Sequence, residues 1–207
     1  MFTRWSNLMS QTPESGFSRD DVAGLVALAT TIAATLILLP NLYGIVGSGL
    51  AVLMIAIAAI DSRRFIIPNE LTAAGLALGF LYAVVKDPGF VGAALAGAAL
   101  RGAVMAFVFW GLQILYRRIR GRDGIGLGDV KLAGVAGVWL DWSAIPVAIE
   151  IAALAALAVY ATRRLRGRAA ASLMTKLPFG LFFAPAIWLV WLLETALFPI
   201  PSVTGFQ

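Results

Sequence analysis

Seven apolar stretches, separated by short polar or glycine- and proline-containing segments, follow one another along most of the chain. They fall near residues 22–40, 43–60, 70–85, 90–116, 127–140, 143–161 and 178–198. Most approach the roughly 20 residues that a helix needs to cross a bilayer. The two shorter ones, 70–85 and 127–140, need flanking residues or a tilted helix in a thinned membrane. The pattern predicts an all-α, polytopic transmembrane helical bundle of about seven spans, with six to eight possible.

The ends of the chain are polar and predict two tails around this bundle. Residues 1–21 lack the basic start, followed at once by an apolar core, that marks a signal peptide. We expect a polar cytoplasmic N-terminal tail over 1–21, a membrane domain over 22–198 and a short C-terminal tail over 199–207.

Composition supports a membrane protein and narrows its chemistry. Of the 207 residues, 60% are hydrophobic and 13% charged, which exceeds what a soluble domain needs for its core. Strand-like polar alternation is nearly absent, which argues against an outer-membrane barrel. The chain has no Cys and no His, so disulfides and His-dependent nucleophilic devices are excluded, and zinc or haem sites would lack their usual ligands. We expect no metal and no cofactor, and any catalysis must use carboxylates, Lys, Ser or Thr.

The net charge of +5 follows a topological pattern. If the N-terminus is cytoplasmic, alternating spans place every Lys and Arg on one side except Lys86, on the other side, and Arg101, within a span. The positive-inside rule therefore predicts a cytoplasmic N-terminus and a C-terminus outside. The basic runs 117–122 and 163–168 are explained by this topology, and we expect the lipid bilayer, not nucleic acid, as the partner.

Two aspartates lie at the cytoplasmic ends of apolar stretches in this topology. Asp61 closes the second stretch and Asp129 opens the fifth, so both are predicted near the inner membrane surface. An ionisable group at a membrane segment is a functional-site candidate, and two carboxylates that share a proton are the working parts of an aspartyl protease. Gly126 and Gly128 would permit unusual backbone angles and a close approach of the fifth span to the end of the second.

Three segments in this order resemble type IV prepilin peptidases. Residues 61–72 place an aspartate ahead of an Ile-Pro-Asn-x-Leu-Thr stretch, residues 126–132 fit a GxGD signature followed by Val-Lys-Leu, and residues 177–180 resemble a Pro-Phe-Gly element before a late span. The resemblance covers roughly residues 43–198. Presenilin and signal peptide peptidase share the GxGD element but have a tyrosine before the first aspartate and a Pro-Ala-Leu motif, so the prepilin branch is favoured.

The resemblance implies a function. It implies an intramembrane aspartyl endopeptidase of the bacterial cytoplasmic (inner) membrane, which removes the leader peptide of a prepilin or pseudopilin substrate during pilus or secretion-system assembly. Asp61 and Asp129 would be catalytic. Residues implied to support the site are Gly126, Gly128, Lys131, Pro178, Phe179 and Gly180.

The chain departs from the longer members of that family in two ways. Those members begin with a cytoplasmic domain that carries Cys-x-x-Cys motifs, and they also methylate the new N-terminus. This Cys-free chain looks like the compact branch associated with tight-adherence (Flp) pili, for which methylation is not implied. The fourth residue of the Pro-Phe-Gly-Pro pattern is Leu181 here.

Several charged residues have two interpretations. Lys131, Arg63 and Arg64 either tune a carboxylate or hold an acidic substrate residue, or they mark topology alone. Asp123 is the rival acid nearest Asp129 and fits a solvated turn, while Asn69 is typical of a helix start after Pro68. The basic loop 163–177 is either a lid over the aspartates or an ordinary connection.

Arg101 and Glu150 lie within spans, about 16 Å and about 10 Å from the outer face at 1.5 Å per residue. They either pair with each other, or Arg101 extends outward or lines a polar cleft. A function of another class also stays open at this point. A small transporter or non-catalytic scaffold would use the aspartates for proton or cation binding, although their place at one edge of the membrane and the odd number of spans argue against it.

Overall fold

The computed structural model of the chain describes residues 19–121, 124–165 and 178–197. Both predicted tails lie outside these ranges, except for the last residues of 1–21, as do Asp123 and most of the loop 163–177. The elements, in chain order, are α2 (Arg19–Leu38), α3 (Leu42–Arg64), α4 (Asn69–Lys86), the 3₁₀ turn η1 (Pro88–Phe90), α5 (Val91–Arg120), α6 (Leu127–Trp139), α7 (Ala144–Leu165) and α8 (Phe179–Leu197). Within the described residues, seven α-helices occupy the seven predicted stretches, which confirms the all-α class.

The helices differ in how well they suit a membrane. Among the described residues, α3, η1 with α5, α7 and α8 are long and apolar enough to cross a bilayer, and Val22–Leu38 is a shorter apolar helix. Helices α4 and α6 fall outside this group, and they correspond to the two stretches predicted to be short. The chain is therefore a multi-pass membrane protein in which four or five helices cross by length and composition.

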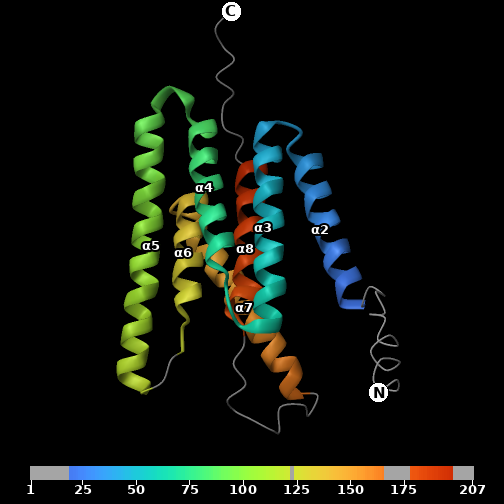
Figure 1. Cartoon of the computed structure of the whole chain (residues 1–207), viewed down its shortest axis with the longest axis vertical. Helices are drawn as coiled ribbons and strands as arrows, with labels where there is room; N and C mark the ends of the chain where they lie inside the picture. The colour runs from blue at the N-terminus through green and yellow to red at the C-terminus, as the bar shows by residue number, and fades with distance from the viewer. Residues whose placement is uncertain (1–18, 122–123, 166–177, 198–207) are drawn as a thin grey trace, which may run out of the picture.

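The bundle is organised around two central helices. Helix α3 packs against α8, and these two are flanked by α2 on the α3 side and by α7 on the α8 side. Helix α4 lies between α3 and α6, and α5 packs along α6 at the far edge (Figure 1). Helices α4, α6 and α8 begin at the end of the bundle where α3 finishes, at the bottom of Figure 1. We call this the aspartate end, because it holds Asp61 and Asp129.

Helix α6 is short because it is an internal element. All of its residues from Leu132 to Trp139 are buried. It meets α5 backbone to backbone, since a Cβ added to Gly137 would lie 2.5 Å from the carbonyl oxygen of Arg101 and 2.8 Å from the Cα of Gly102. Helices in membranes approach this closely only where side chains are absent. The consequence is that α5 fixes the position of α6 within the bundle.

A tight link joins α3 to α4 at the aspartate end. Phe65 ends α3 in the left-handed conformation, with φ 55°, and donates its N–H to the carbonyl of Asp61 at 2.9 Å. Pro68 then starts α4 in extended conformation. Ile67 lies between them and is buried. This reversal places the last turn of α3 beside the first turn of α4.

Candidate active site

Asp61 lies in the last turn of α3 and is only 5% exposed. Its Oδ2 accepts the backbone N–H of Leu181 at 2.9 Å, and Gly180 donates a second backbone N–H to the carboxylate. These donors belong to the first turn of α8, whose N–H groups have no partner within the helix. The positive end of the α8 dipole therefore faces the Asp61 carboxylate and stabilises its charge.

Gly180 is needed for this contact on steric grounds. A Cβ added there would lie 2.8 Å from Oδ2 of Asp61 and 2.8 Å from Cδ1 of Ile67. The Pro-Phe-Gly element thus brings a helix start within reach of a carboxylate. Leu181, where the family pattern has Pro, supplies an N–H that proline lacks. Sequence reasoning missed this donor, because nothing in a leucine side chain signals a role for its backbone.

Asp129 lies in the first turn of α6 and is half-buried. Its Oδ2 accepts the N–H of Gly126 at 3.1 Å, so the carboxylate caps its own helix. The expectation of unusual backbone angles at Gly126 is wrong, because its φ of −79° and ψ of 154° are ordinary extended values. A Cβ at Gly126 would meet Asp129 at 3.4 Å, which is ordinary contact.

Gly128 does permit a close approach, but to a different neighbour from the one expected. A Cβ there would lie 3.0 Å from Cβ of Ile67, in the link between α3 and α4, and not against the end of α3 itself. Ile67 therefore contacts both Gly128 and Gly180. We call the Ile67 side chain the wedge. It lies where the segments that carry Asp61, Asp129 and the start of α8 converge, and it could not be recognised from the sequence. The two carboxylates are close enough for the charge of Asp61 to act on Asp129.

Lys131 and Asn69 form a second link at the aspartate end. Lys131 Nζ donates to Oδ1 of Asn69, which joins the first turns of α6 and α4. Asn69 is the first helical residue and not the cap, because Pro68 occupies the cap position without a side-chain hydrogen bond. Arg63 and Arg64 are exposed in the last turn of α3. The loop 163–177, considered either as a lid or as an ordinary connection, lies outside the described residues from 166 onward.

Arg101 pairs with a different acid from the one considered. Its Nη2 lies 3.8 Å from Oδ1 of Asp141, and its Nε donates to the carbonyl of Gly137 at 3.2 Å. Glu150 is exposed on α7. Of the alternatives, the structure shows Arg101 lining a polar cavity, at the end of the bundle opposite Asp61 and Asp129.

Comparison with known proteins shows the family of this chain. The model of the type IV leader peptidase family matches residues 48–161, which include both aspartates and more than half of the chain. The chain belongs to the type IV leader peptidase family. No solved structure matches it.

Named relatives within the family include proteins of different length. The chain is 35% identical over 146 residues to the prepilin leader peptidase/N-methyltransferase of Burkholderia pseudomallei, which covers 70% of this chain and 45% of that protein. It is 34% identical over 131 residues to leader peptidase HopD of Escherichia coli, covering 63% and 81% of the respective chains. The match therefore spans about half the length of the N-methyltransferase-containing relative and most of HopD.

Proposed function

We propose that the chain is a leader peptidase that uses Asp61 and Asp129 as its catalytic pair. The observation that carries this proposal is the convergence of two carboxylates from α3 and α6, far apart in sequence, at one end of the bundle. Both are oriented by backbone N–H groups, from Leu181 for Asp61 and from Gly126 for Asp129. Membership of the type IV leader peptidase family supports the same roles.

The chemistry follows from two carboxyl groups in a poorly hydrated site. Like charges at short range disfavour double ionisation, so the pair holds one proton over a wide pH range and titrates in two macroscopic steps. The ionised carboxylate takes a proton from a water molecule between the pair, while the protonated one donates to the scissile carbonyl oxygen. The tetrahedral intermediate forms without a covalent bond to the enzyme.

The substrate in this proposal is a prepilin or pseudopilin whose leader lies in the cytoplasm. The last turns of α3 and α5 at the aspartate end carry Arg63, Arg64, Arg117, Arg118 and Arg120. By the positive-inside rule, these residues support a cytoplasmic location for the aspartates. A cleavage point just cytoplasmic of an apolar substrate helix would meet the pair at this level. Gly128, Gly180 and Pro178 with Phe179 position the pair, and Lys131 fastens α6 to α4.

We further propose that the chain serves the tight-adherence (Flp) type of pilus, on the basis of its resemblance to the compact, Cys-free branch. Cleavage of an Flp-type prepilin in preference to a longer type IV prepilin, when each is co-expressed with this chain, would support that subtype. Equal cleavage of both substrates would contradict it.

The deciding experiment is cleavage of a peptide by the purified chain. The probe has a basic leader ending in Gly, followed by an apolar helix, and products are measured by mass spectrometry. Asp61→Asn and Asp129→Asn should each abolish cleavage without changing the elution profile or thermal unfolding. Asp123→Asn and Glu150→Gln, which change acids outside the pair, should retain it. Substantial cleavage by either Asn variant of the pair would exclude this mechanism.

Orientation has its own test, because the chain lacks Cys. Leu127→Cys at the aspartate end and Phe90→Cys at the opposite end both replace exposed residues, 60% and 72% exposed respectively. A membrane-impermeant thiol reagent should label the first only from the cytoplasmic side and the second only from outside. The reverse pattern would overturn the proposed route of the substrate.

A further inference from the structure

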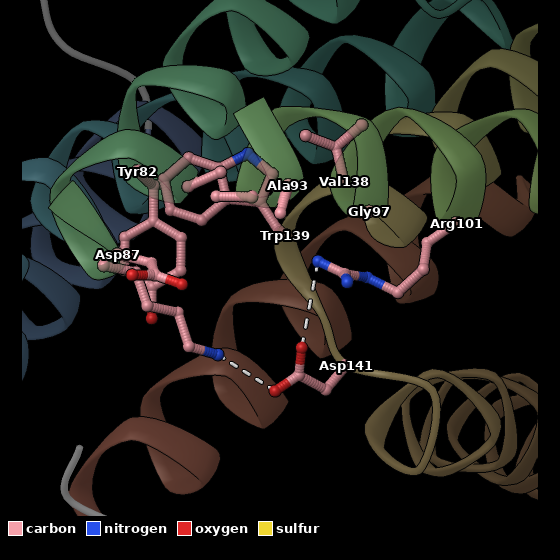
Figure 2. Close-up of a pocket in the computed structure, with 11 residues that line it drawn as sticks. Tyr82, Asp87, Ala93, Gly97, Arg101, Val138, Trp139 and Asp141 are labelled. Carbon is pink, nitrogen blue, oxygen red and sulfur yellow. Dashed lines mark hydrogen bonds and ion pairs between the residues drawn. The ribbon is translucent and has the colours of Figure 1, made fainter. Parts of the chain in front are cut away.

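A polar cavity lies at the end of the bundle opposite the aspartates. It has a volume of about 170 Å³ and is lined by the last turn of α4, the start of α5, the end of α6 and Asp141, which follows α6. Figure 2 shows Arg101 and Asp141 directed into it, with Tyr82, Asp87 and Trp139 around them. The wall from α5 consists of small residues, Ala93, Ala94 and Gly97, so the cavity is not filled from that side.

The ion pairs in this cavity meet at one carboxylate. Lys86 Nζ lies 2.9 Å from Oδ2 of Asp141, and Arg101 Nη2 lies 3.8 Å from Oδ1 of the same group. Glu194 of α8 is a further neighbour of Asp141.

Donors outnumber acceptors on the cationic side of the cavity. Lys86 has three N–H groups and Arg101 has five, whereas their acceptors in the described part of the chain are Asp141 and the carbonyl of Gly137. The Arg101 side chain runs back along α5, since its Nη1 is 3.6 Å from the Cβ position of Gly97. Its guanidinium therefore reaches from within the helix toward the membrane surface at that end.

The charges of the residues that line the cavity balance. Lys86 and Arg101 carry the positive charges, and Asp141, which is paired with both, carries one negative charge. Asp87, which is exposed at the end of α4, carries the second. Two cations and two negative charges line the cavity, which is complementary to a ligand with one charge of each sign.

We propose that this cavity binds the phosphoethanolamine headgroup of a phospholipid. The phosphate would take the spare N–H donors of Arg101 and Lys86, and the primary ammonium would donate to the Asp87 carboxylate at the rim. Phe90 and Val91, one turn before the small-residue wall, are exposed and offer an apolar surface for the acyl chains. A purely anionic headgroup would leave Asp87 unmatched, and a quaternary ammonium has no N–H to donate.

The site can be tested on the purified, delipidated full chain, independently of peptidase activity. Phosphatidylethanolamine, phosphatidylglycerol and phosphatidylcholine with identical acyl chains are added in turn. Bound lipid is counted by native mass spectrometry, and thermal unfolding is followed in parallel. We expect one retained phosphatidylethanolamine and at least about tenfold weaker binding of the other two lipids.

Variants separate the two halves of the headgroup. Arg101→Gln should lower phosphatidylethanolamine binding at least about tenfold, since a charge-assisted contact to phosphate is lost. Asp87→Asn replaces an exposed residue and should fold even if Arg101→Gln does not. It should remove the preference over phosphatidylglycerol while phosphate binding persists. Glu150→Gln, an exposed acid on α7, is the matched control and should bind as the unmodified chain does.

Three results would overturn the proposal. Equal retention of phosphatidylcholine would show that the headgroup is not recognised. An unchanged lipid preference in Asp87→Asn would show that the ammonium is not held at the rim. Stabilisation by water-soluble phosphoethanolamine, without retention of the lipid, would assign the cavity to a free metabolite.

Discussion

The two ends of the bundle use carboxylates in opposite ways. At the aspartate end, Asp61 and Asp129 interact through their charges, and their hydrogen-bond donors in the described part of the chain are backbone N–H groups. At the other end, the Asp141 carboxylate forms ion pairs with both Lys86 and Arg101. Burial raises the pKa of Asp141, but the hydrogen bond and charge of Lys86 outweigh it and hold that pKa below its usual value.

The hydrogen-bond partners of a carboxylate decide whether it suits the proposed proton exchange or a structural role. A carboxylate whose hydrogen bonds come from neutral N–H groups has no adjacent cation to hold it ionised. It can therefore exchange a proton with an acidic neighbour, as we propose for the pair. A carboxylate held by two cations stays ionised, joins helices and is useless as an acid.

The largest effect is expected from Gly180→Ala. The added methyl would overlap the Asp61 carboxylate and Ile67, both 2.8 Å from the Cβ position, and push the pair apart. A displacement near 1 Å costs about 10²-fold in turnover, so kcat for peptide cleavage should fall by about that factor. Gly111→Ala on α5, where no atom lies within 4 Å of the new methyl, is the matched control and should leave kcat unchanged. Normal turnover by Gly180→Ala would remove the α8 start from the site.

A smaller effect is expected from Gly128→Ala. Its methyl would meet Ile67 at 3.0 Å, and the isoleucine side chain can yield in part. We expect about tenfold lower kcat, which corresponds to about 1.4 kcal/mol. Ile67→Ala in the same chain should restore part of the loss, because it removes the atoms that the methyl meets. Failure of the double variant to recover, with both single variants folded, would mean that Ile67 is not the wedge.

At the other end, Asp141→Asn should change stability and not chemistry. The variant leaves Lys86 and Arg101 without their shared counter-charge, in a partly exposed position. We expect a loss of about 1 kcal/mol in unfolding free energy, measured by denaturant titration in detergent, with kcat unchanged. A large fall in kcat without loss of stability would show that the two ends are coupled.

The smallest effect is a difference in acid sensitivity. Because the folded pKa of Asp141 lies below its unfolded value, its contribution to stability is present above the unfolded pKa of about 3.9 and is lost as pH falls through the folded pKa. The thermal unfolding temperature of the unmodified chain should therefore fall below about pH 4 by more than that of Asp141→Asn. Parallel pH profiles for the two proteins would show that the Lys86 contact adds nothing measurable.

Much of this architecture could be predicted from hydropathy, because the length of an apolar run fixes a membrane helix. The seven stretches follow from the length of the apolar runs and from the polar, glycine and proline segments between them. The place of Asp61 and Asp129 at one end follows from these spans and from the placement of Lys and Arg. The role of Gly180 was anticipated only by family resemblance. The donor at Leu181 and the wedge at Ile67 could not be predicted, since they depend on which helix start meets which side chain. Pairing of Arg101 with Asp141, and not Glu150, depends likewise on the rotation of helices about their axes.

The short helix α6 is surrounded by other helices, and this affects how the protein responds to bilayer thickness. With 13 residues it rises only about 20 Å, and its buried face meets protein and not acyl chains. Bilayer thickness therefore acts on the longer outer helices, such as the 30-residue α5, which adjust by tilting. The depth of Asp129 is set by the protein interior. The arrangement of Asp61 and Asp129 that we propose to be catalytic should therefore persist as the hydrocarbon core thickens or thins with growth temperature and lipid supply.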